Sequence, residues 1–199
     1  MKRLAVDFVL LPPTPLMDEV ISLNNRLCNS NIILDRDKCF PHISLLMGCL
    51  THDALVNAKS VLRTIASQTK VMLLKIPGTR TVGTEFGNVL ALDIEPDKVL
   101  QSLHESIVHT LGDSLSTDAV KADVFGSSAN DSTLGWINSF AKESSFDNFW
   151  PHITVGYLKE GSGSENIEPR SFRASRLAIC HLGNYCTCRG ILEEAQLVG

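Results

Sequence analysis

Hydrophobic and polar positions along the chain follow two periods, one of two residues and one of three to four. The longer period is that of one face of a helix, and it predicts helices at residues 16–27, 55–65, 100–111 and 134–140. Apolar and alternating runs predict strands at residues 4–10, 71–76, 82–85, 88–94, 172–182 and 186–197.

The segments between these elements are rich in residues that cap helices or form turns. Thr51 is expected to cap the helix that follows it, and Pro96 is expected in the first turn of the helix at residues 100–111. The polar stretch 112–131 is predicted to be loop with a short helix, and residues 160–165 to be a flexible surface loop. The last two strands are expected to form a closing antiparallel pair.

One short stretch occurs twice in the chain. Residues 40–44 read Phe-Pro-His-Ile-Ser, and residues 150–154 read Trp-Pro-His-Ile-Thr. Each copy continues into apolar residues, and proline suits the first position of a strand, where its missing N–H costs little. The alternative is that two unrelated buried histidines happen to follow proline, but five positions matching in register favour a functional repeat.

Side chains alternate between the two faces of a strand, so the repeat has a polar face and an apolar face. His42 and Ser44 share one face, and His152 and Thr154 share the corresponding face of the second strand. A strand with an imidazole and a hydroxyl on one face and apolar side chains on the other is suited to line a cleft. With the same motif in each half, the pattern predicts an α+β fold made by duplication: one domain over residues 1–199, in which two antiparallel sheet-and-helix lobes face a central cleft.

Composition restricts the kinds of partner. A formal net charge of −4 argues against long, sequence-independent contact with duplex DNA, which requires a basic face, but it allows a small phosphorylated ligand or an RNA end. No apolar window is long enough for a membrane span, and no export signal is convincing, since Asp7 interrupts the first apolar run. We therefore expect six reduced cysteines, a cytoplasmic location and a monomer.

Two histidines that face one cleft can perform acid–base chemistry, because imidazole titrates near neutral pH. His42 and His152 suit an in-line displacement at phosphorus, in which one activates the entering oxygen and the other protonates the leaving oxygen. Hydroxyls beside them can donate hydrogen bonds to the non-bridging phosphate oxygens. The four other histidines fall at no motif spacing and are predicted to be surface or structural residues, so we expect neither a metal site nor a cofactor.

The repeated motif resembles that of the 2H phosphoesterase superfamily, which is named for two H-x-[S/T] motifs and includes cyclic phosphodiesterases and the "2′-5′ RNA ligase" proteins. The residues that carry the resemblance are His42-Ile43-Ser44 and His152-Ile153-Thr154, both preceded by proline. The resemblance implies a bilobal fold, His42 and His152 as catalytic residues, and Ser44 and Thr154 as phosphate-binding hydroxyls.

The resemblance also implies metal-independent chemistry at a phosphodiester that involves a ribose 2′ oxygen. The expected function is hydrolysis of a 2′,3′-cyclic phosphate or a related 2′-linked phosphodiester of a nucleotide or RNA end. The alternatives are 2′-5′ RNA ligation or RNA-end processing, and a phosphate- or RNA-binding module without turnover. Many RNA-ligase-type members have a basic residue soon after the second motif, whereas the first cation here is Lys159, which favours a small nucleotide. Tyr157 or Trp150 could stack on a base, although core packing is the preferred role for Trp150.

Overall fold

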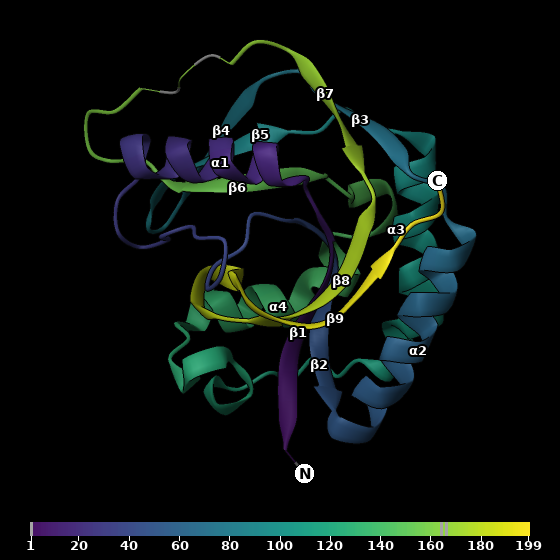
Figure 1. Ribbon diagram of the computed structural model, residues 1–199. Coiled ribbons are helices and arrows are strands. Elements are labelled where there is room, and N and C mark those ends of the chain that lie inside the picture. Colours follow the sequence, from purple (N-terminus) through teal and green to yellow (C-terminus); the bar gives the residue numbers. More distant parts are fainter. Residues whose placement is uncertain (1, 164, 166) are drawn as a thin grey trace.

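The computed structural model describes residues 2–163, 165 and 167–199. Four α-helices and five short 3₁₀ turns are interleaved with the strands (Figure 1): α1 (Thr14–Leu27), α2 (His52–Gln68), α3 (Lys98–Leu111), α4 (Asp131–Glu143), η1 (Gly112–Ser114), η2 (Lys121–Asp123), η3 (Phe125–Ser127), η4 (Phe146–Asn148) and η5 (Asn184–Cys186). The strands are β1 (Arg3–Leu11), β2 (Ile43–Thr51), β3 (Met72–Ile76), β4 (Thr79–Thr84), β5 (Gly87–Asp93), β6 (His152–Tyr157), β7 (Arg170–Ala174), β8 (Arg176–Leu182) and β9 (Cys188–Gln196).

The predicted elements are confirmed in type, and in order except for one predicted strand that is two strands. Each of the four predicted helices forms around the apolar positions that predicted it, and the apolar positions of α2 and α3 are buried. Thr51 caps α2 as predicted, because its hydroxyl accepts from the backbone N–H of Ala54 at 3.2 Å. The stretch 112–131 consists of loop and 3₁₀ turns, and Ser164 of the predicted loop 160–165 lies outside the described residues.

Two predictions about element boundaries were wrong. Pro96 lies before the first turn of α3, because Asp97 is the N-cap and its carboxylate accepts from the N–H groups of Val99 and Leu100. The expected strand 172–182 is two strands, β7 and β8, which have different partners. Only β8 forms the predicted closing pair with β9, while β7 pairs with β3. An apolar pattern alone does not show where a chain changes sheets.

The strands form two main antiparallel sheets and one strand pair. The larger sheet has the order β2-β1-β8-β9, the smaller has the order β4-β5-β6, and β3-β7 stands alone. One histidine strand, β2, is an edge strand of the larger sheet, and the other, β6, is an edge strand of the smaller sheet. The α+β class and its two lobes are as predicted.

Both histidine strands have a bulge at the same point of the motif. In the β1–β2 ladder, Ser44 is opposite Val9 and Leu46 is opposite Phe8, so Leu45 between them has no partner on β1. In the β5–β6 ladder, Thr154 is opposite Ala91, and Val155 likewise has no partner on β5. A bulge locally disrupts the ladder, so its residue needs a hydrogen-bond partner outside the sheet.

Helices of one half pack against the histidine strand of the other half. The segment between β1 and β2 contains α1, which contacts β6. The segment between β5 and β6 contains α3 and α4, and both contact β2. Figure 1 shows α1 lying along β6, and α2 and α3 together on the opposite side of the molecule. The strands are thus duplicated, but the helices are exchanged between the lobes.

This exchange brings one buried polar side chain to each bulge. Asn24 of α1 donates through Nδ2 to the carbonyl of Val155 at 2.7 Å. His104 of α3 donates through Nδ1 to the carbonyl of Leu45 at 2.8 Å, and its Nε2 accepts from the N–H of Phe146. Each helix therefore supplies the hydrogen bond that the bulged strand lacks, and His104 is one of the structural histidines predicted from the sequence.

The expectation of six reduced cysteines was wrong for one pair. Cys180 of β8 and Cys188 of β9 form a disulfide, while Cys28, Cys39, Cys49 and Cys186 are free thiols. Cysteine spacing does not show this pair, because a register shift in the β8–β9 ladder brings the two residues together. Cysteine usage therefore no longer favours a reducing compartment.

In the part of the chain that the structure describes, no helix is long and apolar enough to cross a membrane.

We expect Asn24→Ala to destabilise the fold strongly. Besides Val155, the Asn24 side chain bonds the carbonyl of Ile32 and the N–H of Leu34, so the change leaves three buried backbone groups unpaired. Each such group costs about 1–3 kcal/mol, so we expect a loss of at least about 2 kcal/mol in the free energy of unfolding in urea. The neighbouring Asn25 is exposed, and Asn25→Ala is the matched control, with an effect within about 0.5 kcal/mol. Equal effects of the two variants would contradict this role for Asn24.

Candidate active site

The two repeated histidines are held by the same local hydrogen bond. His42 Nδ1 lies 2.8 Å from the carbonyl oxygen of Phe40, and His152 Nδ1 lies 2.9 Å from that of Trp150. Because a carbonyl oxygen only accepts, Nδ1 carries the hydrogen in both rings. Nε2 is then the nitrogen that can accept or deliver a proton, and it is the same nitrogen in both halves.

The structure brings these two side chains together. Their strands, β2 and β6, contact each other, and His152 is near enough for its charge to lower the pKa of His42. The side chain of His42 is only 12% exposed. The two motif histidines are therefore near each other, and their joint role in one site stays a prediction.

Burial makes both imidazoles weaker bases than free histidine. It lowers the pKa of His42 from 6.5 to about 4, the hydrogen bond to Phe40 offsets part of this effect, and the charge of His152 adds to it. The pKa of His152 is also lowered, mainly by burial, with Arg80 acting in the same direction and Asp93 against it. Both rings are therefore neutral in the free protein at neutral pH.

His152 is covered by an aromatic ring that is itself fixed in place. The indole of Trp150 stacks on the imidazole, with 4.2 Å between the ring centroids. Trp150 Nε1 donates to Asp93 Oδ1 at 2.6 Å, and the guanidinium of Arg80 donates to Asp93 Oδ2 while lying 4.8 Å from the indole centroid. Trp150 therefore packs on the histidine, and this network orients the ring.

His42 has a different neighbour, the carboxyl of Asp7. Asp7 is fully buried on β1, and its Oδ2 lies within hydrogen-bonding distance of Ser44 Oγ, at 2.6 Å, and 3.6 Å from His42 Nε2. Burial raises the pKa of Asp7 well above its ordinary value, and the hydrogen bonds to it offset this only in part. The sequence analysis assigns Asp7 no role in the site, although an acidic residue inside an apolar strand is a signal of one.

The two motif hydroxyls are in different situations. Ser44 already has a partner in Asp7, whereas no hydrogen bond from Thr154 Oγ1 is found within the described residues. Thr154 is half-buried opposite Ala91, on the strand that starts with His152. In the described part of the free protein, Thr154 is thus the motif hydroxyl for which no side-chain hydrogen bond is found.

Tyr157 lies at the far end of β6 and is buried in the core. Its ring packs edge-on against Tyr185, with 5.3 Å between the ring centroids, and the centroid of Tyr185 in turn lies 5.9 Å from that of the exposed ring of Phe86.

Tyr185 and Cys186 both have a left-handed backbone, with φ of 58° and 53°. Burial raises the pKa of the Cys186 thiol, and the charge of Asp7 adds to this effect, so the turn lies near Asp7. Tyr185 was not predicted from the sequence.

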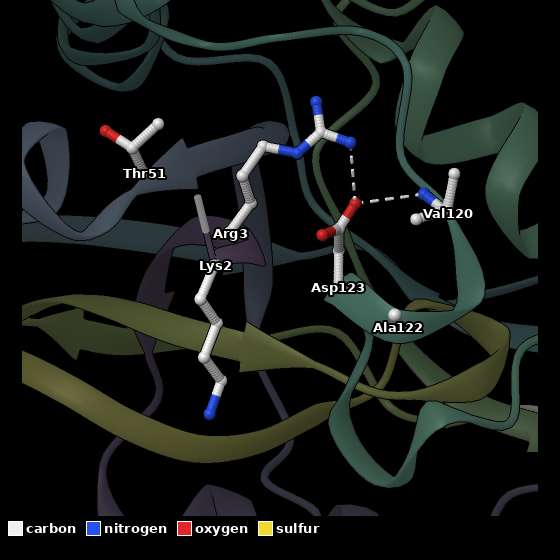
Figure 2. Close-up of a pocket in the computed structure, with 6 residues that line it drawn as sticks. All are labelled: Lys2, Arg3, Thr51, Val120, Ala122 and Asp123. Atoms are coloured by element: carbon white, nitrogen blue, oxygen red, sulfur yellow. Dashed lines mark hydrogen bonds and ion pairs between the residues drawn. The ribbon is translucent and has the colours of Figure 1, made fainter.

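The cavity in Figure 2 is a different place. It has a volume of about 510 Å³ and is lined by Lys2, Arg3, Thr51, Val120, Ala122 and Asp123. Arg3 pairs with Thr51 at one end of the β1–β2 ladder, whereas His42 precedes the other end. The guanidinium of Arg3 is also neutralised by Asp118 and Asp123.

Among the described residues, no group of three or more His, Cys, Asp or Glu side chains is placed to hold a metal ion.

Comparisons with solved structures show that other proteins share this fold. The fold matches TT0787 of Thermus thermophilus with a TM-score of 0.61 and 16% identity, covering 98% of this chain and 99% of that one. It matches E. coli LigT, solved with NADP⁺, with a TM-score of 0.58 and 15% identity over the full length of both chains. A structure described as a phosphoesterase matches with a TM-score of 0.57 and 13% identity, again over the full length of both chains. No curated protein matches the sequence.

A family model decides the assignment. The model of the 2′-5′ RNA ligase superfamily matches residues 35–182, a range that contains both repeated motifs and most of the chain. The chain therefore belongs to the 2′-5′ RNA ligase superfamily.

Proposed function

We propose that this protein hydrolyses a 2′,3′-cyclic phosphate or a related 2′-linked phosphodiester, with His42 and His152 as the acid–base pair. The observation that carries the proposal is the matched pair of Nδ1–carbonyl hydrogen bonds, at 2.8 and 2.9 Å, which leaves Nε2 of each imidazole for proton transfer. Two such nitrogens from facing strands suit the two proton transfers of a displacement at phosphorus.

In this reaction one imidazole takes a proton from water while the water oxygen attacks phosphorus. The other, in its protonated form, gives a proton to the ribose oxygen as the P–O bond breaks. The first histidine ends the reaction protonated and the second neutral, so one proton exchange with solvent resets the pair. The Thr154 hydroxyl donates to a non-bridging oxygen, where negative charge increases in the transition state.

The proposed substrate is a small nucleotide. LigT has been solved with ATP, with phosphate and with 3′-AMP, which supports a nucleotide-sized ligand for a protein of this fold. Lys159, the first cation after the second motif, donates to the carbonyls of Asn25 and Arg26 at the end of α1 and is not directed at the histidines. For base stacking we propose Tyr185 with Phe86 in place of the predicted Tyr157, because Tyr157 is buried behind Tyr185.

A second candidate is 2′-5′ ligation or RNA-end processing, which the family match favours. The chemistry at phosphorus is the same, but the entering group is a ribose hydroxyl instead of water. Assays on adenosine 2′,3′-cyclic phosphate and on a 2′-5′ linked dinucleotide distinguish the two functions by their products. A protein that binds both and turns over neither would be a binding module.

The first prediction of this proposal concerns the two histidines. In His42→Asn and His152→Asn the amide can still donate to the carbonyl two residues before it, but the Nε2 atom is lost. Each variant should lose about 10²–10⁴ in kcat/KM on adenosine 2′,3′-cyclic phosphate. The double variant should lose little more than either single one, because a displacement that lacks one proton transfer is already blocked.

His109 is an exposed histidine on α3 and gives the matched control. His109→Asn should keep wild-type turnover. Melting temperatures separate a lost proton transfer from a lost fold. A folded His152→Asn variant with near wild-type turnover would remove His152 from the mechanism.

The second prediction concerns metal ions. Both proton transfers are assigned to imidazoles, so turnover should persist in excess EDTA at the rate seen without it. The measurement is the initial rate before and after dialysis against the chelator. Loss of activity that returns with one divalent ion would assign the reaction to metal-assisted hydrolysis.

The third prediction concerns pH. Burial lowers the pKa of both histidines, that of His42 from 6.5 to about 4, so the free enzyme loses its catalytic acid at a pH below 6.5. The profile of kcat/KM should be bell-shaped, with its maximum on the acid side of pH 6.5. On the alkaline side it should fall by about tenfold per pH unit, as loss of one proton requires. A profile that still rises above about pH 8 would contradict the assignment.

A further inference from the structure

Asp7 is a buried carboxyl in contact with both residues of the first motif. Its Oδ2 is 2.6 Å from Ser44 Oγ and 3.6 Å from His42 Nε2. Its Oδ1 is buried and has no donor at hydrogen-bonding geometry among the residues that the structure describes. Its neighbours on β1, Val6 and Phe8, are fully buried and apolar. A carboxyl in such a place is costly, so it calls for a functional explanation.

The fold itself does not require an acid at this position. The two bulged ladders can be aligned through Ser44 opposite Val9 and Thr154 opposite Ala91. Asp7 lies two residues before Val9, and the residue two before Ala91 is Val89. The second lobe therefore builds the same ladder with an apolar side chain, and the carboxyl is specific to the side of the site that holds His42.

An ionised Asp7 would work against the proposed chemistry in two ways. A carboxylate 3.6 Å from His42 Nε2 would repel the phosphodiester that this nitrogen must reach. It would also accept the only hydrogen of the Ser44 hydroxyl, which could then donate nothing to the phosphate. A neutral carboxyl avoids both problems, because it adds no charge and can itself be the donor.

We propose that Asp7 is a positioning residue for Ser44: its carboxyl keeps its proton in the working enzyme, donates it from Oδ2 to Ser44 Oγ, and so leaves the serine hydrogen for the phosphate. This inference rests on the proposed function, since it assumes an oxyanion beside His42. No covalent bond is made or broken by Asp7, and its proton stays on the carboxyl throughout the reaction. Asp7 acts only through the direction of the Ser44 hydroxyl.

The groups that surround Asp7 support a neutral carboxyl. His42 on β2 is kept uncharged by burial, and the thiol of Cys186 has a raised pKa. Opposite Asp7 in the two ladders are Met47 and Cys180, and Cys180 is in the disulfide. In the free protein at neutral pH, none of these groups supplies a positive charge. Hydrogen bonds from Ser44 and from the backbone N–H groups of Leu45 and Leu46 lower the pKa of Asp7, but burial outweighs them and raises it. A bound phosphate anion would raise it further.

The test is binding of inorganic sulfate, an oxyanion whose charge is constant around neutral pH, measured by calorimetry on the wild type and four variants. Asp7→Ala removes the donor to Ser44, so sulfate should bind about two- to tenfold more weakly. Asp7→Asn supplies a neutral amide that can donate in place of the acid, so it should recover most of that loss. In a Ser44→Ala background, adding Asp7→Ala should cause no further loss, because Asp7 acts through Ser44.

The protonation state is measured directly from the ¹³C chemical shift of the Asp7 carboxyl, assigned by comparison with Asp7→Asn. We expect the shift of a neutral acid at pH 7. This signal does not depend on catalysis, so it separates the inference from the proposed function. An ionised carboxyl at pH 7, or equal sulfate affinity of wild type and Asp7→Ala, would overturn the role of Asp7 alone. Failure of the wild type to bind sulfate would overturn the oxyanion site and this inference with it.

Discussion

Each histidine strand has one carbonyl at its bulge that depends on a hydrogen bond from outside its own sheet. Leu45 and Val155 are bulged out of their ladders one residue after the motif hydroxyl. An unpaired carbonyl in the core would cost a substantial part of the free energy of folding. His104 and Asn24 remove that cost, and each reaches its carbonyl from a helix that belongs to the other half of the chain. The bulge, the helix position and the direction of the motif side chains are thus determined together.

The same arrangement produces a site in which two identical rings have different surroundings. Backbone carbonyls fix both imidazoles with the hydrogen on Nδ1. Beyond that first contact the lobes diverge, since His42 lies beside the buried carboxyl of Asp7 and His152 lies under an indole held by Asp93. A reaction that needs one acid and one base requires two unlike sites, and these neighbours supply the difference.

The sequence was sufficient for the four predicted helices, for most of the strands and for the fold class, and its repeat identified both histidine strands. The apolar positions of a helix such as α2 lie close together in the sequence, so its period can be recognised there. A five-residue repeat with histidine at the same place in both copies is too specific to be chance. The missing parts depend on contacts between residues far apart in the chain. The Cys180–Cys188 disulfide depends on a register shift, and the place of Tyr185 beside Tyr157 depends on a left-handed turn in non-glycine residues. The sequence shows that Asp7 is an acidic residue in an apolar strand, but its contacts with Ser44 and His42 depend on how β1 pairs with β2.

The exchanged helices also bear on how such a fold could be divided. A half that ends before β5 would keep α1 but lose β6, the strand against which α1 packs. Its own histidine strand, β2, would lose α3 and α4, and the carbonyl of Leu45 would be left without His104. Such a half would also lose β8, the strand that pairs with β1 in the larger sheet. A cut between the two motifs would therefore leave both lobes incomplete, because each is built from residues of both halves of the chain.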